Sequence, residues 1–275
     1  MGVLFGAIQG VSEWLPISSK TQIIIASHYF LPSLQLGQSY AFGLFLEGGT
    51  FIAAIVYFRR QVLGVLKALV GRGDQEERML LKFLLIATAI TAVLGIAIYK
   101  VVSDWAKGPA LGVPMIILGC VLVGDGILIT LARGRRTPTK GLADLRNRDI
   151  VIIGIVQGIA AFPGVSRSGM TVSAMLLMGV KPEESFRLSF LALIPASIGA
   201  TGVTMLLSNA SIGSVVDTLT FPVVLLMILV AALVGLVSVR TLLKAAGSKR
   251  IALLTFVLGA LAILSGITSI YFGAG

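Results

Sequence analysis

Hydrophobic residues in this sequence fall into long runs that short polar stretches separate. Six runs are long enough to cross a bilayer as helices, at residues 42–58, 83–102, 111–132, 188–206, 221–239 and 251–272. A transmembrane β-barrel would instead show short segments that alternate between apolar and polar residues. Because a spanning segment must satisfy its backbone hydrogen bonds internally, the pattern predicts an all-α polytopic membrane protein with one integral membrane domain over residues 1–275.

Two further apolar stretches are broken in the middle. Residues 1–30 are interrupted at Pro16 and a polar cluster, and residues 150–180 are interrupted between 162 and 169. None of the four pieces has the roughly 20 apolar residues that a crossing needs. We therefore expect two re-entrant helical hairpins in addition to six transmembrane helices, with a polar loop at residues 181–187 after the second hairpin.

Basic residues cluster on one side of this topology. The formal net charge is +10; six Lys or Arg lie within residues 59–82, six within 133–148 and four within 240–250, whereas 28–41 and 207–219 contain none. This distribution follows the positive-inside rule, so we expect a multi-pass plasma-membrane protein whose cytoplasmic loops contact anionic lipid headgroups. Nucleic acid is not needed to explain the charge, and the mean hydropathy of +0.99 agrees with membrane residence.

The two broken stretches are similar in sequence. AIQGVSEWLPISS and IVQGIAAFPGVSRS share a Gln-Gly pair, an aromatic residue close to a proline, and following serines. Three predicted crossings follow each hairpin, and the charges place the first hairpin on the outer side and the second on the inner side. Residues 1–132 and 149–275 therefore form an inverted-topology repeat, unless the Gln-Gly pair recurs by chance. In such folds the binding site lies near mid-membrane, where the broken segments meet.

The strongest chemical signal is the sequence PGVSRSGMT in the second broken stretch. An arginine within a membrane segment is unfavourable by about 2.5–3.5 kcal/mol on insertion scales, and by default it faces a protein interior or a water-filled cavity. The proline and glycine before it end one helix and let the backbone approach a ligand. A guanidinium among hydroxyl groups suits phosphate. We therefore predict a buried phosphate site at Pro163, Gly164, Ser166, Arg167, Ser168 and Thr171.

The first broken stretch would complete this site, because the repeat brings Gln9, Glu13, Ser18 and Ser19 toward it. In phosphate hydrolysis, Glu13 could act as a base, as an acid, or as a ligand of Mg²⁺ or Ca²⁺. Ser19 or Ser166 could be a covalent nucleophile, or water could attack directly, and the sequence does not choose among these. Glu47, inside the crossing at 42–58, is a further candidate.

Plainer interpretations fit the same residues. Serine and threonine in membrane helices often bond only to the backbone or to a neighbouring helix. Glu13 and Arg167 could form a structural ion pair. Lys20 either attracts an anionic substrate or extends to the outer headgroups.

Both motifs resemble the undecaprenyl-pyrophosphate phosphatase family, also called the bacitracin-resistance family. QGVSEWLPISS at residues 9–19 is similar to the family's (E/Q)GxxE(F/W)LPxSS stretch, and PGVSRSGMT at residues 163–171 matches its PGxSRSxxT stretch at every fixed position. The resemblance implies removal of one phosphate from a C55-type polyprenyl pyrophosphate, which recycles the lipid carrier for cell-envelope glycan synthesis. It also implies a metal-assisted site that opens outward, with Mg²⁺ or Ca²⁺ and Glu13 as a ligand.

By this resemblance the catalytic residues are Glu13, Ser19, Ser166, Arg167 and Thr171. We further predict substrate contacts at Gln9, Ser18, Gln22, Glu47, Pro163, Gly164 and Ser168. One stretch departs from the family. SSKTQ stands where members usually have SSxGH, so Gln22 replaces a histidine and Lys20 a small residue. Glutamine cannot shuttle a proton, which shifts acid–base chemistry to Glu13 or water. A homodimer is one assembly that we consider.

Transport is the rival function, because inverted repeats with paired broken helices also form transporters. The same site would then hold the headgroup of a polyprenyl phosphate that is flipped across the membrane. A solute or drug carrier would leave the hydroxyl cluster around Arg167 without a purpose. Hydrolysis and flipping are separable, since a phosphatase releases orthophosphate in detergent and a pure flippase does not.

Overall fold

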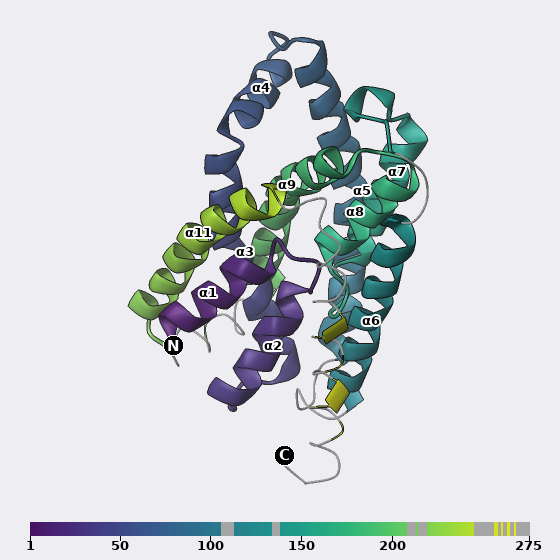
Figure 1. Ribbon diagram of the computed structural model, residues 1–275. Coiled ribbons are helices and arrows are strands. Elements are labelled where there is room, and N and C mark those ends of the chain that lie inside the picture. Colours follow the sequence, from purple (N-terminus) through teal and green to yellow (C-terminus); the bar gives the residue numbers. More distant parts are fainter. Residues whose placement is uncertain are drawn as a thin grey trace.

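The computed structural model describes residues 1–105, 113–133, 138–207 and 219–244, together with isolated positions between 213 and 267 (Figure 1). Every regular element in these ranges is a helix. Four helices are long and apolar enough to cross a membrane: α3 (Leu36–Tyr57), α5 (Gln75–Trp105), α9 (Pro182–Leu207) and α11 (Phe221–Lys244). The prediction of an all-α multi-pass membrane protein is therefore confirmed.

The other two predicted crossings are described less completely. Helix α6 (Val113–Arg133) occupies the predicted crossing at 111–132 and carries the shorter apolar segment Ile116–Leu128. The predicted crossing at 251–272 lies outside the described residues apart from isolated positions. The total of six crossings therefore stays a prediction.

Both broken stretches are pairs of short helices, as predicted. The first pair is α1 (Gly2–Ser12) and α2 (Ser19–Phe30), and the second is α7 (Asn147–Ile159) and α8 (Arg167–Leu177). A short 3₁₀ helix, η1 (Leu142–Asp144), precedes α7. At 1.5 Å per residue these four helices are about 16–20 Å long, which is less than the roughly 30 Å of a hydrocarbon core.

Each hairpin packs most extensively against a helix from the other half of the chain. Helix α1 lies along α11, and α7 lies along α5 (Figure 1). Glycines allow the close approach: a Cβ atom at Gly10 would lie 2.9 Å from the carbonyl oxygen of Ala231, and one at Gly158 would lie 2.7 Å from Cβ of Leu94. GAIQG in α1 and GIVQG in α7 both place two glycines four residues apart on one helix face. The shared Gln-Gly pairs are thus part of a helix-packing motif.

Two polar segments that the sequence predicts to be loops are helical in the structure, because polarity alone does not distinguish a loop from an exposed helix. Residues 59–69 form α4 (Arg59–Leu69), whose apolar residues recur at helical spacing beside the basic ones. The loop predicted at 181–187 is also wrong, since α9 begins at Pro182. Proline suits the first position of a helix, acidic residues in the first turn interact favourably with its dipole, and Arg187 pairs with Glu184 at 2.8 Å.

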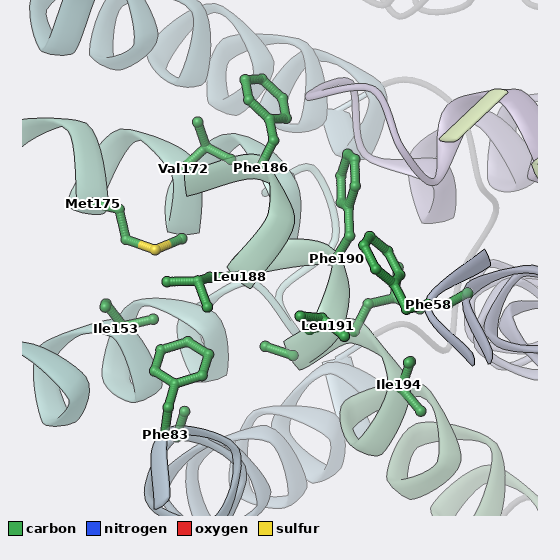
Figure 2. Packing of buried hydrophobic residues seen from close by; sticks show 14 of the residues in the cluster. Phe58, Phe83, Ile153, Val172, Met175, Phe186, Leu188, Phe190, Leu191 and Ile194 are labelled. Carbon is green, nitrogen blue, oxygen red and sulfur yellow. The ribbon is translucent and has the colours of Figure 1, made fainter. Parts of the chain in front are cut away.

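The main hydrophobic core surrounds the first half of α9. Leu188, Phe190 and Leu191 are at most 1% exposed and pack with residues of α5, α7 and α8 (Figure 2). Trp14, between α1 and α2, is fully buried, and its ring meets Phe190 edge-on with 5.0 Å between ring centroids. The core therefore fixes the turn of the first hairpin against α9.

Candidate active site

The turns of the two hairpins touch one another. The hydroxyl of Ser168 donates to the carbonyl oxygen of Leu15 at 3.0 Å, and a Cβ atom at Gly169 would lie 3.1 Å from the side chain of Pro16. Arg167, the first residue of α8, reaches Glu13 at the end of α1. The prediction that the two polar motifs lie together is confirmed.

The guanidinium of Arg167 is the centre of this contact. Its Nη2 donates to Oε1 of Glu13, and its Nη1 donates to the hydroxyl of Ser197 at 3.2 Å and lies 3.4 Å from Oε2 of Glu47. The arginine side chain is 11% exposed and each carboxylate 3%. Buried charges are tolerated when they are paired and hydrogen-bonded. Arg167, Glu13 and Glu47 alone carry a formal net charge of −1, so they also favour a second cation nearby.

Both carboxylate oxygens of Glu13 are engaged. Oε1 faces Arg167, and Oε2 accepts from Nε2 of Gln9 at 2.7 Å and from the hydroxyl of Ser19 at 2.6 Å. Gln9 lies one turn earlier in α1, and Ser19 is the first residue of α2. A serine hydroxyl held on a carboxylate is the pairing in which the carboxylate can serve as base for a serine nucleophile.

Ser197 was not among the predicted site residues. It lies in α9, is fully buried, and donates to Oε2 of Glu47 at 2.9 Å while it accepts from Arg167. It therefore connects the second carboxylate to the arginine. The signal in the sequence is a polar residue two positions after Pro195 in an apolar stretch, where a serine commonly bonds to a neighbouring helix.

Two of the predicted catalytic hydroxyls hold the start of α8. The hydroxyl of Ser166 accepts the N–H of Gly169 at 3.2 Å, which makes this serine the N-cap of the helix. The hydroxyl of Thr171 donates to the carbonyl oxygen of Arg167 at 2.8 Å and lies 2.7 Å from the hydroxyl of Ser189. In this conformation both residues fix the helix turn that presents Arg167.

The remaining predicted substrate contacts, Ser18, Gln22, Pro163 and Gly164, shape the two turns. Ser18 has a φ of +54°, a left-handed conformation that is unusual for serine. Nε2 of Gln22 donates to the carbonyl oxygen of Ile17 at 3.1 Å, so this glutamine braces the first turn. Gly164 has a φ of +93°, and a Cβ atom there would lie 3.1 Å from Leu118 of α6.

A cavity of about 180 Å³ adjoins the arginine. Its charged residues are Lys20, Glu47 and Arg167, and its walls come from α3, α5, α7 and α9. Most of the wall is apolar or aromatic, with Tyr40, Leu44, Ala92, Ile96, Tyr99 and Val203. Glu13 and Ser19 do not line the cavity, but Arg167, which donates to Glu13, does.

The α5 and α7 walls of the cavity carry polar groups that were not predicted. Nε2 of Gln157 donates to the hydroxyl of Thr91 at 3.2 Å, and that hydroxyl donates its only proton to the carbonyl oxygen of Gly154 at 3.1 Å. The amide oxygen of Gln157 therefore faces away from Thr91. Within the described part of the chain, this oxygen and the hydroxyl of Thr88 are buried without a hydrogen-bond partner. Both residues line the cavity, where a ligand or water can bond to them.

Comparison with known proteins gives the relationship of the chain. The sequence model of the family described as bacitracin resistance protein BacA matches residues 2–264. The chain belongs to this family. A Saccharolobus solfataricus protein named undecaprenyl-diphosphatase is 50% identical over 270 residues, or 98% of this chain and 96% of that protein. Proteins of the same name from Sulfurisphaera tokodaii (42% identical, 98% and 97% covered) and Pyrobaculum aerophilum (39%, 99% and 98%) are also similar.

The divalent ion implied by the resemblance to the BacA family can be tested against the donors present. Mg²⁺ and Ca²⁺ bind carboxylate and carbonyl oxygens. Both oxygens of Glu13 and one of Glu47 are already engaged, and among the residues that the structure describes no three Asp, Glu, His or Cys side chains gather as a metal-binding group. Arg167 and Lys20 beside them already balance the charges of the two carboxylates. These residues do not fit a resident divalent ion, and the metal requirement stays a prediction.

Proposed function

We propose that this protein hydrolyses a polyprenyl pyrophosphate of the undecaprenyl type to the monophosphate and orthophosphate, and so recycles a lipid carrier for cell-envelope glycan synthesis. One observation carries the proposal: the cavity joins a charged end at Lys20, Glu47 and Arg167 to walls that are mostly apolar. A lipid with an anionic headgroup and a hydrocarbon tail complements both parts. The relatives named undecaprenyl-diphosphatase support the same substrate.

Substrate binding would exchange the partners of Arg167. Its donors now point to Glu13 and Ser197, with Glu47 close by. A terminal phosphate carries more negative charge than either carboxylate, and the guanidinium fork matches two of its oxygens. We expect the guanidinium to turn toward the phosphate, which opens Glu13 and Ser19 to the substrate.

Ser19 is the nucleophile that the geometry favours. Because its hydroxyl donates to Oε2 of Glu13 at 2.6 Å, the carboxylate can take the proton as Oγ attacks the terminal phosphorus. The bond between that phosphorus and the bridging oxygen breaks, and Glu13 passes the proton to the leaving lipid monophosphate. Water then cleaves the phosphoserine, again with Glu13 as base, and releases orthophosphate. Direct attack by water on the same phosphorus gives the same products.

We propose that the site opens to the outer side of the membrane. The cavity is lined by positions 40–47 of α3, 88–99 of α5 and 195–203 of α9. Each of these segments lies far from the helix end that adjoins the charged segments at 59–82 and 181–187. Because the positive-inside rule places those charged ends in the cytoplasm, the cavity falls in the outer half of the membrane.

We also propose that residues 1–132 and 149–275 are inverted repeats. In each half, the first helix of the hairpin packs against a helix of the other half, α1 on α11 and α7 on α5, which supports this relationship. The direct contact of α3 with α9 supports it as well. When the two Gln-Gly pairs are superposed, Ser18 and Ser166 coincide as the residues that precede α2 and α8.

Orthophosphate release from a polyprenyl pyrophosphate by the purified, detergent-solubilised protein tests the function. We expect release in the wild type and at least a hundredfold less in Arg167→Ala, because loss of two hydrogen bonds to the phosphate, each contributing about 1.5–3 kcal/mol, removes about 3 kcal/mol or more. A well-folded protein that releases no orthophosphate but moves polyprenyl phosphate across vesicle membranes would replace hydrolysis with transport.

A further inference from the structure

We propose that Lys20 is a second phosphate-binding cation, which together with Arg167 supplies the positive charge that the diphosphate requires in place of a resident divalent ion. The inference rests on the proposed function and adds one residue to it. Lys20 stands where the resembling family has a small residue, so the motif itself does not assign it a role.

The position of Lys20 is unfavourable for a lysine unless a negative partner or ligand is present. It is the second residue of α2, is 4% exposed and lines the cavity. Positive charge in the first turn of a helix is opposed by the helix dipole. An ionisable side chain that faces an interior cavity of a membrane protein marks a functional site by default. The backbone of Lys20 packs against α3, since a Cβ atom at Gly43 would be in ordinary van der Waals contact with the Cα of this lysine, at 3.5 Å.

Negative charge near Lys20 comes from the two site carboxylates. Glu13 and Glu47 both interact electrostatically with Lys20 and with Arg167. Two carboxylates and two cations make the site neutral before substrate enters. A diphosphate that reaches the cavity therefore meets two cations, each of which can exchange a carboxylate for phosphate oxygens.

The two cations offer different geometries. Arginine presents a planar fork that matches two oxygens of one phosphate, whereas a lysine ammonium is a compact charge on a flexible stem. Neutralising phosphate oxygens is the part that divalent ions commonly play in phosphoryl transfer. Lys20 can play this part here, where both oxygens of Glu13 and one of Glu47 are already engaged and the two cations already balance the two carboxylates.

The test compares Lys20→Met, Lys20→Arg and the control Lys67→Met, which removes the same charge from an exposed position of α4. Orthophosphate release from a polyprenyl pyrophosphate is measured in detergent with excess EDTA and again with Mg²⁺. We expect the wild type and Lys67→Met to stay active in EDTA. Lys20→Met should lose kcat/KM by about tenfold to hundredfold, mostly through KM, as expected for a hydrogen bond to a charged group. Lys20→Arg should retain most of the activity, and Mg²⁺ should partly restore Lys20→Met.

A binding measurement separates this proposal from a structural role. Inorganic pyrophosphate in EDTA should raise the Tm of the wild type more than that of Lys20→Met; if the methionine variant does not fold, Lys20→Gln takes its place. The assignment would be overturned if Lys20→Met, or Lys20→Gln in its place, kept the kcat/KM of the wild type. It would also be overturned if the wild type lost its activity in EDTA. Absence of orthophosphate release from every folded protein would instead overturn the proposed function, and the pyrophosphate shift alone would then decide the role of Lys20.

Discussion

Replacing Arg167 with lysine keeps the charge at the centre of the site and removes the planar fork. In the structure the guanidinium donates to Glu13 from one nitrogen and to Ser197 from another, which also lies 3.4 Å from Glu47. A lysine ammonium at this position can reach one carboxylate closely, but not both. The variant therefore leaves one buried carboxylate poorly paired and offers the phosphate a point charge.

The size of the effect follows from these contacts. A hydrogen bond to a charged group contributes about 1.5–3 kcal/mol, so loss of one of two bonds to the phosphate should lower kcat/KM about 10- to 150-fold. Removing one partner of a buried ion pair destabilises a protein by about 3–5 kcal/mol. Because the lysine in Arg167→Lys retains one of the two pairs, we expect about half of this loss, roughly 2 kcal/mol.

The assay measures initial rates of orthophosphate release against substrate concentration, together with thermal unfolding in the same detergent. Arg187→Lys is the matched control, because Arg187 also pairs with two carboxylates, Glu184 at 2.8 Å and Glu76 at 3.4 Å, but does not line the cavity. Its kcat/KM should change less than about twofold, in keeping with a partly exposed pair. Turnover of Arg167→Lys within threefold of wild type, in a folded sample, would refute the idea that the guanidinium fork holds the phosphate.

Three further variants test other parts of the structure. Glu13→Gln should abolish orthophosphate release and retain a pyrophosphate-induced rise in Tm, because an amide can accept hydrogen bonds but cannot take a proton; loss of that rise would make Glu13 structural. Ser197→Ala should lower kcat/KM by about tenfold, since it removes an acceptor for the arginine and a donor to a carboxylate, and unchanged kinetics would exclude it from positioning the arginine. Gly10→Ala should lower the free energy of unfolding by about 1–3 kcal/mol, because the added Cβ would lie 2.9 Å from the carbonyl oxygen of Ala231. Gly202→Ala, where a Cβ meets nothing within 4 Å, is the control, and equal Tm values for the two glycine variants would contradict close packing of α1 on α11.

Most of the helical framework could be predicted because the bilayer sets both the length and the composition of its segments. Helices α3, α5, α9 and α11 cover four predicted crossings. The errors lie where helices leave the apolar layer. Helix α4 and the first turn of α9 are polar enough to suggest loops, yet helical spacing in α4 and Pro182 with two following glutamates are helix signals.

Some contacts of the site could likewise be predicted from the sequence, and others could not. The meeting of Glu13 with Arg167 could be predicted, because both lie beside breaks in apolar stretches and an unpaired charge there would be costly. Ser197, Thr88 and Gln157 could not, since their roles depend on which faces of α9, α5 and α7 turn toward the cavity. A helix that is apolar on all sides gives no periodic signal for that choice.

The two hairpins are built alike but contribute different chemistry. With the Gln-Gly pairs superposed, Glu13 corresponds to Ala161 and Ser19 corresponds to Arg167. If both hairpins carried the glutamate and neither the arginine, two negative charges would be buried without a counter-ion. If both carried the arginine and neither the glutamate, two positive charges would be buried without one. In the second hairpin the backbone of Ala161 instead accepts the hydroxyl of Tyr40 at 2.6 Å, which attaches the turn to α3. Divergence at these two positions puts the proposed base and nucleophile in one half and the proposed phosphate-binding arginine in the other, so the proposed reaction requires both halves to be packed together.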